Sequence, residues 1–472
     1  MKQSKISSTL VVLVIFLVLF TTFSILSVEA RKNHSEKSKI HNQKKEKKNN
    51  GSHSNNSPAP APVYGGGHQT HSTSFNIFSF GAKGDGACDD SKALLGAWKA
   101  ACSVPGATLQ IPSGFKFLIN SINLQGPCMP RLTLQIDGTL LAPPRIGSWP
   151  KSSLFQWLNF KWVQNFIIQG SGTVDGQGSN WWKYSQTDCS KQNKQTKTIP
   201  SMKPTAMRFY SSNNVTVRGI KIINSPLCHL KFDDSQGVKI NNITILAPEN
   251  SLNTDGIHLQ NTKDVEIVHS SIGSGDDCVS IQTGCSNIYI QHINCGPGHG
   301  ISVGGLGKDK SVACVSDIII DNIFMENTHY GARIKTWQGG LGLVHNVSFS
   351  NIHVSNVKVP IMIDQYYCDK GFCKNQTRAV AISGVKFDQI IGTYATKPIH
   401  LACSNSIPCT NIDLFNIQLK PSTGFSGLQK GLCWNSYGKS EAPLAPSSMD
   451  YCVRKESDFV RRISRSHEFS CQ

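Results

Sequence analysis

Apolar and polar residues alternate along the second half of the chain in a nine-residue phrase that recurs eight times. The phrase begins at residues 214, 237, 264, 287, 317, 346, 384 and 411, and its first copy reads NVTVRGIKI. In each copy the alternation breaks at the fifth or sixth residue and then resumes, which is typical of two short strands that meet at a corner. Repetition at intervals of 23 to 38 residues indicates a solenoid with one coil per repeat.

Repeated strands without a helical pattern predict an all-β fold, a right-handed parallel β-helix. A β-sandwich is the competing interpretation, but hairpin turns do not produce repeats of fixed phase. The one helical candidate is the segment Asp89 to Cys102, in which Leu94, Leu95 and Trp98 have helical spacing. We expect it to form a short N-terminal helix that caps the first coil.

A further short strand follows four of these phrases, and aligning these strands brings polar residues from different coils together. Asp255, Asp277 and His299 then occupy one column at intervals of 22 residues. The alignment takes one apolar residue of each strand as inward-facing: Ile257, Val279, Ile301 and Ile334. The next column holds Gly256, Cys278, Gly300 and Arg333, and the outward column after it holds His258, Ser280, Ser302 and Lys335. Successive coils lie about 4.8 Å apart, so these side chains are expected to gather on one ridge.

Two adjacent aspartates, Asp276 and Asp277, lie in this ridge within the stretch GSGDDCVSI. On a regular strand one of them would face the core, so we expect a local bulge or turn that swings both carboxylates outward. Together with Asp255 they form a group of three acids, and at least one pKa must be raised because three close carboxylates do not all ionise cheaply. We expect Asp276 to hold the proton. One protonated carboxyl beside ionised ones supplies the acid and the base that glycosidic hydrolysis needs.

The same ridge carries an imidazole and two cations. Arg333 and Lys335 are two residues apart on one strand and point the same way, so they could hold a substrate carboxylate. His299 lies between two glycines, which gives it room to approach a substrate or to tune the acid. Singly, each of these residues is more often a turn former or a solvated surface residue, but the whole set in register favours a functional site. A second acidic pair, Asp233 and Asp234, falls after its strand in phase and is predicted to be a turn.

The ends of the sequence differ in composition from the repeats. Residues 1–30 have a charged start, an apolar run from Leu10 to Leu26 and a small-residue cleavage site, which predict a secretory signal peptide. An uncleaved membrane anchor is the alternative for this run. Residues 31–73 are rich in Lys, Pro and Gly and predict a disordered linker, either a solvated spacer or an electrostatic tether. Residues 74–472 are expected to form one catalytic domain.

The charge of the chain points to an acidic partner. Of the net charge of +17, residues 1–30 contribute +1 and residues 31–50 contribute +6, which leaves +10 for the rest of the chain. A basic domain suits a polyanion, and the secretory signal favours an acidic polysaccharide over nucleic acid. We expect a secreted, extracellular monomer that has no contact with a membrane once the signal is cleaved.

Sixteen cysteines in a secreted chain predict disulfides rather than a metal site, and no His/Cys/Asp cluster has zinc spacing. The close pairs Cys368/Cys373 and Cys403/Cys409 are expected to staple loops. Sequons suit an extracellular surface and predict glycosylation. They lie at Asn214, Asn242, Asn346 and Asn375, with three more in the linker at Asn33, Asn50 and Asn55.

Four motifs of the ridge resemble those of the polygalacturonase family, glycoside hydrolase family 28, and in particular a plant-type secreted member. They are Asn253-Thr254-Asp255, Gly275-Asp276-Asp277, Gly298-His299-Gly300 and Arg333-Ile334-Lys335. Their order and spacing agree with the family, and the resemblance extends from Phe75 to about Cys452. It implies inverting hydrolysis of α-1,4-linked galacturonan in pectin, without a cofactor or a metal, in modification of the cell wall.

The resemblance also implies roles for single residues. Asp276 resembles the general acid, Asp255 and Asp277 resemble the pair that activates water, and His299 looks like the residue that supports the acid. Substrate would be bound by Asn253, Arg333, Lys335 and Tyr367, with Tyr366 as a competing choice for the last. Cys278 and Cys295 look like a disulfide that fixes the active strand. Gly305 departs from the pattern, since the family more often has Ser there.

Cleavage within the pectin chain is favoured, and exo-cleavage is the first alternative. A calcium-dependent pectate lyase is a second, because it too is a β-helix that acts on an acidic polymer. A non-catalytic wall-binding protein is a third, but the complete set of acids, cations and imidazole argues against it.

Overall fold

The computed structural model of the protein describes residues 73–149, 156–187, 203–369, 373–423, 429–449, 452–453 and 471. The predicted signal peptide lies outside the described residues. So does the predicted linker, apart from its last residue.

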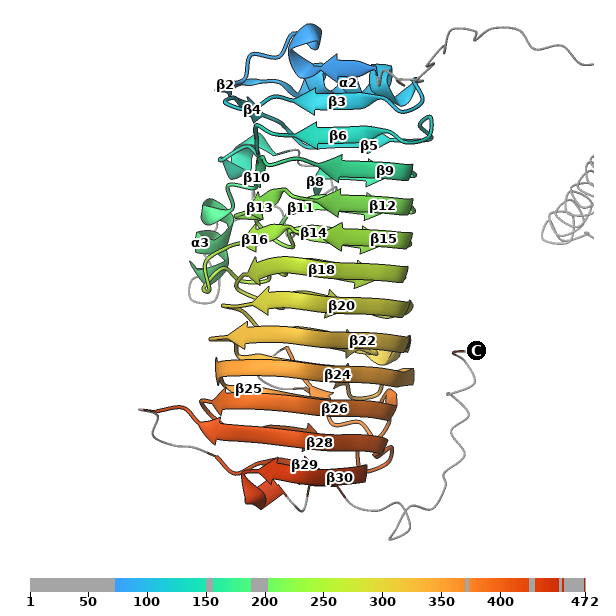
Figure 1. The fold of residues 1–472 in the computed structure, drawn as a ribbon, viewed down its shortest axis with the longest axis vertical. Coiled ribbons are helices and arrows are strands. Elements are labelled where there is room, and N and C mark those ends of the chain that lie inside the picture. The colour runs from blue at the N-terminus through green and yellow to red at the C-terminus, as the bar shows by residue number, and fades with distance from the viewer. Residues whose placement is uncertain are drawn as a thin grey trace, which may run out of the picture. The chain divides into compact units, whose positions relative to one another are not determined.

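One strand from each coil forms an eleven-stranded parallel sheet, called sheet B below (Figure 1). Its strands are β5 (Ile122–Gln125), β8 (Gln156–Lys161), β11 (Thr205–Tyr210), β14 (Leu230–Asp233), β17 (Ile257–Gln260), β19 (Val279–Ile281), β21 (Ile301–Leu306), β23 (Tyr330–Trp337), β25 (Val359–Tyr367), β27 (Ile399–Ala402) and β29 (Leu432–Trp434).

The other strands form sheet A, which has nineteen strands and is also parallel. The first coils contribute β1 (Ser74–Asn76), β2 (Asp85–Asp89), β3 (Thr108–Ile111), β4 (Lys116–Leu118), β6 (Thr133–Ile136), β7 (Thr139–Leu141), β9 (Gln164–Gln169) and β10 (Thr173–Asp175). The phrase repeats contribute β12 (Asn213–Arg218), β13 (Lys221–Ile223), β15 (Gln236–Asn241), β16 (Thr244–Leu246), β18 (Lys263–Gly273), β20 (Cys285–Cys295), β22 (Val312–Glu326), β24 (Leu341–Val357), β26 (Ala381–Tyr394), β28 (Cys409–Pro421) and β30 (Ser436–Ala445).

The sequence phrases coincide with the corner in sheet A. In the first phrase the corner separates β12 from β13, whereas from β18 onward one long strand bends through it. Its corner residue, His269, has a φ of 50°, and Asp264 at the start of the phrase has a φ of 56°. Asn and Asp tolerate this left-handed conformation better than most residues, so the polar residues that break the alternation also turn the chain. The prediction of a parallel β-helix with two strands meeting at a corner is confirmed.

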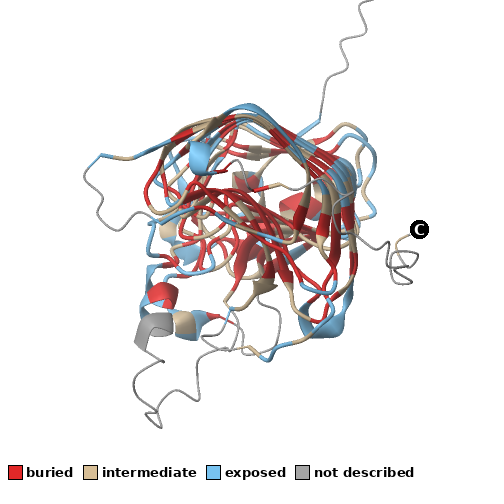
Figure 2. Ribbon diagram, turned by 90° about the horizontal axis from the view of Figure 1, so that it is seen from below, coloured by how far each residue is buried: buried red, intermediate tan, exposed pale blue. Residues whose placement is uncertain are grey.

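The core lies between the sheets and consists of equivalent residues stacked coil on coil, as the view along the solenoid axis shows (Figure 2). The rings of Phe160 and Phe209 lie 4.8 Å apart, and those of Phe209 and Phe232 lie 4.7 Å apart, both stacked. Such ladders fix the register of successive coils, because a slip by one residue would turn every side chain to the opposite face. The register in turn positions the polar side chains outside sheet B.

Among the described residues two α-helices accompany the strands, α2 (Ser91–Cys102) and α3 (Ser179–Thr187). The first confirms the predicted cap, since Leu94 and Trp98 are buried against the first coils. The second corrects the expectation of a single helix. Its bulky residues Trp181 and Trp182 are adjacent, so no helical period was visible, yet the indole nitrogen of Trp182 donates to the carbonyl of Ser225 at 3.2 Å. Short 3₁₀ helices occur at Ile77–Phe80, Ile146–Ser148, Lys308–Lys310 and Ser447–Met449.

Six disulfides link the described part of the chain, and they include the expected loop staples Cys368–Cys373 and Cys403–Cys409. The other four are Cys102–Cys128, Cys278–Cys295, Cys314–Cys471 and Cys433–Cys452. Three further described cysteines, Cys88, Cys228 and Cys285, are not in disulfides.

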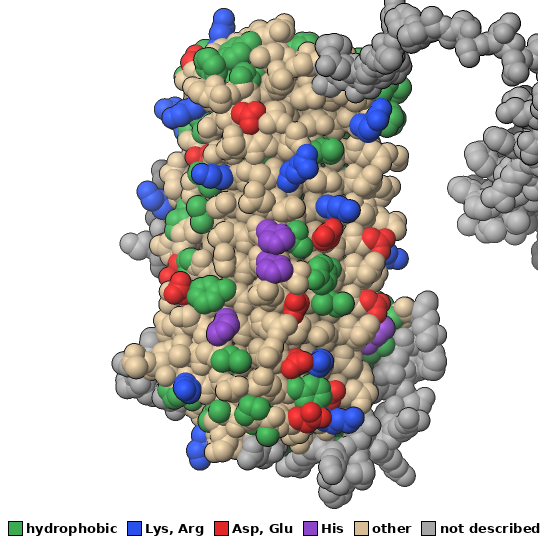
Figure 3. Space-filling model, viewed as in Figure 1, with side chains coloured by type: hydrophobic (Ala, Val, Ile, Leu, Met, Phe, Trp, Pro, Cys, Tyr) green, Lys and Arg blue, Asp and Glu red, His purple; other side chains and the backbone are tan. Residues whose placement is uncertain are grey.

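The four sequon asparagines outside the linker are exposed, and their glycosylation stays a prediction. On the face formed by the long strands of sheet A, charged side chains of both signs and hydrophobic ones are scattered over the whole height (Figure 3). None of the helices in the described ranges is long and apolar enough to span a bilayer.

Candidate active site

The predicted ridge lies on the outer face of sheet B, where β17, β19, β21 and β23 are neighbours. Ile257 pairs with Val279, and Val279 pairs with Ile301, so the column of Asp255, Asp277 and His299 is confirmed. These three residues each stand two positions before their paired strand residue.

The alignment of the fourth coil was wrong by two residues. Ile301 pairs with Ala332 rather than with Ile334, and Ser302 therefore pairs with Arg333. Both Ala332 and Ile334 are apolar and face inward, so strand period alone could not choose between them. As a result Tyr330 is the fourth member of the acid column. Arg333 joins the outward column of His258, Ser280 and Ser302, and Lys335 pairs with Gly304 instead.

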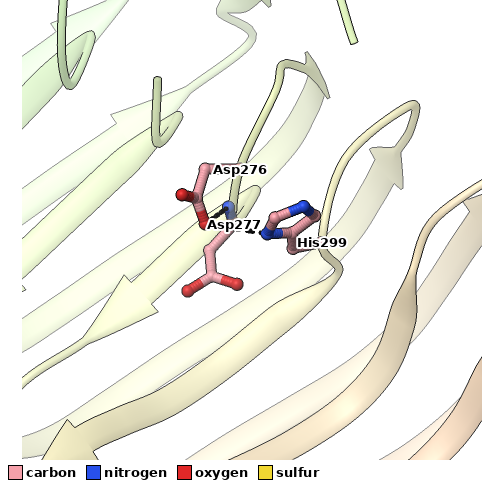
Figure 4. Close-up of side chains that lie close together, drawn as sticks. All are labelled: Asp276, Asp277 and His299. Atoms are coloured by element: carbon pink, nitrogen blue, oxygen red, sulfur yellow. Dashed lines mark hydrogen bonds and ion pairs between the residues drawn. The ribbon is translucent and has the colours of Figure 1, made fainter. Parts of the chain in front are cut away.

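The aspartate doublet lies in a bend between β18 and β19, which agrees with the predicted local turn. An Asp276 oxygen is 3.0 Å from His299 Nδ1 and also accepts the Asp277 backbone N–H at 2.8 Å (Figure 4). The disulfide between Cys278 and Cys295 joins the residue directly after the doublet to the end of β20, as the family resemblance implied. The bend is thereby tied to the neighbouring coil.

The second carboxylate of the doublet, Asp277, is almost completely buried and fully paired. Lys335 Nζ lies 2.7 Å from one of its oxygens, and the hydroxyl of Ser302 donates to the other at 2.7 Å. Arg333 Nη1 lies 3.8 Å from the same oxygen as Ser302. An ionised carboxylate in a dry site requires such partners, and these donors stabilise its negative charge.

The third acid, Asp255, precedes β17 and has a different environment. Its nearest partner is His258 Nδ1 at 3.2 Å. Burial raises the pKa of Asp255, and the negative charge of Asp276 raises it further.

The pKa of Asp276 moves in the opposite direction. Burial favours its neutral form, but the hydrogen bond and charge of His299, followed by the charge of Lys335, outweigh it and lower the pKa of Asp276 to about 2. The expectation that Asp276 itself holds the proton is therefore wrong for this arrangement. Of the three acids of this cluster, Asp255 is the one whose pKa is raised.

The two cations of the site, Arg333 and Lys335, each lie close to an aromatic ring. The guanidinium of Arg333 is 4.1 Å from the ring centroid of Tyr330, and Lys335 Nζ is 5.4 Å from that of Tyr367. Arg333 Nε and Nη1 are buried and make no hydrogen bond within the described part of the protein. A buried donor without an acceptor is costly, so this guanidinium is poised to receive an acceptor from outside, such as a substrate carboxylate.

The remaining predicted binding residues also lie at the site. Asn253 Nδ2 donates to the outer oxygen of Asp276 at 3.3 Å. Of the tyrosine doublet, Tyr367 faces the two cations, whereas the Tyr366 hydroxyl donates to the carbonyl of Cys403 at 3.3 Å. At Gly305, a side chain would meet the rings of Trp337 and Tyr367 at 3.0 Å, which gives a steric reason for glycine there.

Several residues of the site were not assigned a role from the sequence. His258 and Ser302 were visible only as members of the outward column. The ring of His329 stacks on His299 at 4.7 Å, and Tyr330 lies edge-on to both. The correct phase of β23 would have placed Tyr330 in the acid column.

One group of three side chains could hold a metal ion within the described ranges: Asp276, Asp277 and His299, with one ligand atom from each within 4.8 Å of the others. Lys335 and Ser302 already occupy the oxygens of Asp277, and His299 Nδ1 is directed at Asp276. The donor set therefore fits an acid–base cluster better than a cation site, since an ammonium group lies where a cation would have to bind.

Asp233 corrects another expectation. It is the last residue of β14 rather than part of a turn, and it forms ion pairs with Arg208 and with Lys231, the latter at 3.3 Å. Only Asp234, with a φ of 51°, has turn geometry.

Known proteins resemble this chain in sequence and in fold. The sequence profile described as Glycosyl hydrolases family 28 matches residues 102–433. A probable polygalacturonase of Arabidopsis thaliana is 40% identical over 394 residues, which cover 83% of this chain and 86% of that protein. A polygalacturonase of Chamaecyparis obtusa is 42% identical over 361 residues, which cover 76% of this chain and 69% of that protein.

Solved structures agree on the fold. The polygalacturonase of Erwinia carotovora ssp. carotovora superposes with a TM-score of 0.64 at 23% identity and covers 83% of this chain and 100% of its own. The family match and the relatives at about 40% identity show the family of the chain as well as its fold. The chain belongs to glycosyl hydrolases family 28 and is a glycoside hydrolase.

Proposed function

We propose that the protein is a secreted polygalacturonase that hydrolyses α-1,4-galacturonosidic bonds within pectin chains of the cell wall. The observation that carries this proposal is the meeting, on one face of sheet B, of three carboxylates and two buried cations. Relatives that bear the name polygalacturonase support the same substrate class.

The cations select an acidic sugar. Three carboxylates alone would repel a galacturonate, but Lys335 neutralises Asp277, and Arg333 keeps two buried nitrogens without acceptors. A sugar carboxylate can take that position with charge-assisted hydrogen bonds. The ring of Tyr367 closes the same position from the side.

Asp276 acts as the general acid in this mechanism. Its oxygen meets His299 Nδ1 at 3.0 Å, so the pair can hold one proton between them. Asp276 donates this proton to the glycosidic oxygen as that oxygen develops negative charge, while His299 supports the carboxyl through the same hydrogen bond. Asn253 orients the second oxygen of the acid.

Asp255 and Asp277 activate the water. Lys335 and Ser302 hold the two oxygens of Asp277 in place, and Asp255 becomes ionised as the pH rises through its raised pKa. Carboxyl pairs of inverting enzymes are generally about 6.5–9.5 Å apart so that water fits between them. His299 is hydrogen-bonded to Asp276, so we assign Asp276 to the acid and the water to Asp255 together with Asp277.

The decisive experiment measures hydrolysis of polygalacturonate and the product lengths over a short time course. Internal cleavage gives a ladder of oligomers, whereas exo-cleavage releases one size only. Proton NMR should show the β-anomer first, because inversion of an α-linkage produces it, and an initial α-anomer would contradict the single-displacement mechanism. The Asp276→Asn variant should lose about 10²- to 10⁴-fold in kcat.

The same assay separates the alternatives. A pectate lyase would form unsaturated products that absorb in the ultraviolet and would lose activity with a chelator, whereas we expect full activity with a chelator. Unchanged hydrolysis by Asp276→Asn would refute the site. A wild-type protein that binds polygalacturonate without cleaving it would be the wall-binding alternative.

A further inference from the structure

A second pair of cations lies on the outer face of sheet B, on the opposite side of the acids from Arg333 and Lys335. Arg208 on β11 pairs with Lys231 on β14, and Lys231 pairs with His258 on β17. The column continues through Ser280 and Ser302 to Arg333 on β23. Arg208 and Lys231 therefore lie in the same outward row as the active site. Lys231 is one strand before His258, which contacts Asp255, and Arg208 is two strands before it.

The positive charge of Arg208 and Lys231 is only partly balanced by their neighbours. Asp233, only 8% exposed in its side chain, contacts Arg208 Nε and lies 3.3 Å from Lys231 Nζ. One carboxylate thus serves two cations, which leaves one positive charge in excess. The side chains of Arg208 and Lys231 are 23% and 24% exposed, and the terminal guanidinium nitrogens of Arg208 make no hydrogen bond to any described residue.

The cations are also held in place. The guanidinium of Arg208 lies 5.0 Å from the ring centroid of Tyr210, and Asp233 anchors its Nε from below. A planar guanidinium fixed on one edge presents its other edge for bidentate binding of a carboxylate. A purely solvated surface pair would not need a buried carboxylate and a ring to orient it.

We infer that Arg208 and Lys231 form a carboxylate-binding subsite for galacturonate residues on the far side of the scissile bond from Arg333. The inference rests on the proposed function, because it assumes an acidic polymer along sheet B. Strands lie about 4.8 Å apart, so Lys231 and Arg333, four strands apart, are separated by about 19 Å along the sheet. A 1,4-linked chain carries one carboxylate per sugar at an advance similar to the strand spacing, and several consecutive sugars span the two cation pairs.

This placement has a consequence for the substrate. Cations on both sides of the acids bind sugars on both sides of the cleaved bond, which favours attack inside a chain over attack at its end. They also require carboxylates that are not methyl-esterified at several positions. The protein would therefore prefer blocks of consecutive free galacturonate.

The test compares Lys231→Gln and Arg208→Gln with a matched control. Each variant removes one cation while the other still pairs with Asp233, so no buried carboxylate is left alone. The control is Lys239→Gln, an exposed lysine on β15 of the same coil but on sheet A, which changes the net charge equally. Lys231→Arg retains the charge. Thermal unfolding of all variants confirms that they fold.

With long unesterified polygalacturonate we expect Lys231→Gln and Arg208→Gln to raise KM about tenfold at nearly unchanged kcat, because a charged hydrogen bond to the substrate is lost before and in the transition state alike. Lys231→Arg should restore most of the loss. With oligomers too short to reach Lys231, the variants should match the wild type.

Equal KM values for Lys231→Gln, Arg208→Gln and the Lys239→Gln control on long polymer would overturn the subsite and leave the proposed function intact. A rise in KM that is the same for short and long oligomers would overturn it too, since it would show a general electrostatic effect. A wild-type protein without hydrolysis of polygalacturonate would overturn the proposed function and this inference with it.

Discussion

The coupling energy between Lys335 and Asp277, which form a buried ion pair, should be far larger than that of an exposed pair at the same distance. Lys335 Nζ lies 2.7 Å from Asp277, with side-chain exposures of 8% and 2%. Lys386 Nζ on β26 lies 2.7 Å from Asp388, with exposures of 46% and 32%. The two pairs share one distance and differ in burial, which makes them a matched comparison.

Removing one member of the buried pair leaves a charge without its partner in a dry site. Lys335→Met or Asp277→Asn alone should lower the free energy of unfolding by about 3–5 kcal/mol. The double variant should lose much less stability than the sum of the two single variants. Each substitution removes the charge that the other substitution would leave buried without a partner. For Lys386→Met and Asp388→Asn, solvent screens the charges, and the coupling should be about 0–1 kcal/mol.

The assay is urea unfolding near neutral pH for both sets of single and double variants, analysed as two double-mutant cycles. A coupling energy of several kcal/mol at Lys335–Asp277 and almost none at Lys386–Asp388 is the expected outcome. Additive single costs at the buried pair, or equal coupling at both pairs, would refute the reasoning that burial rather than distance sets the magnitude.

Three further predictions concern the acids and their support. Asp255→Asn should abolish turnover and yet raise the free energy of unfolding near neutral pH: a raised carboxyl pKa destabilises the fold above that pKa, and the effect disappears in acid. A urea titration that shows lower stability for this variant at neutral pH would contradict it. The pKa of Asp276, lowered to about 2 from 3.8, should contribute about 2 kcal/mol of stability above pH 4 that is lost as the pH falls toward 2. In Asp276→Asn that part of the acid dependence should be missing, and an identical pH profile of unfolding would count against the assignment. Replacing Cys278 and Cys295 by Ser opens a link across 17 residues and should lower the free energy of unfolding by about 3 kcal/mol, whereas an unchanged urea midpoint would show that the coil does not need it.

The repeat pattern was sufficient for the fold because a β-helix is built from local regularities. Each nine-residue phrase carries its own alternation and its own corner residue, and stacking identical units leaves little choice of topology. The cap helix was readable for the same reason, through the spacing of Leu94 and Trp98. The helix α3 was not, because adjacent tryptophans have no period and its position depends on a contact with Ser225.

The acid column could also be found from the sequence, because equal spacing of 22 residues keeps Asp255, Asp277 and His299 in phase. The phase was lost at β23, where the coil is longer and two apolar residues compete for one inward position. The tertiary structure decided that Ala332 pairs with Ile301, and it thereby placed Arg333 in the outward row that also holds Lys231.

The sequence by itself determined which residues lie on the ridge, because residue type and spacing along the chain can be read without knowing the three-dimensional structure. What only the tertiary structure decided is how those residues share charge. The pKa of Asp255 is raised and that of Asp276 is lowered, because hydrogen bonds and ion pairs act over a few ångströms. Such distances are set by the packing of the coils rather than by their order in the chain.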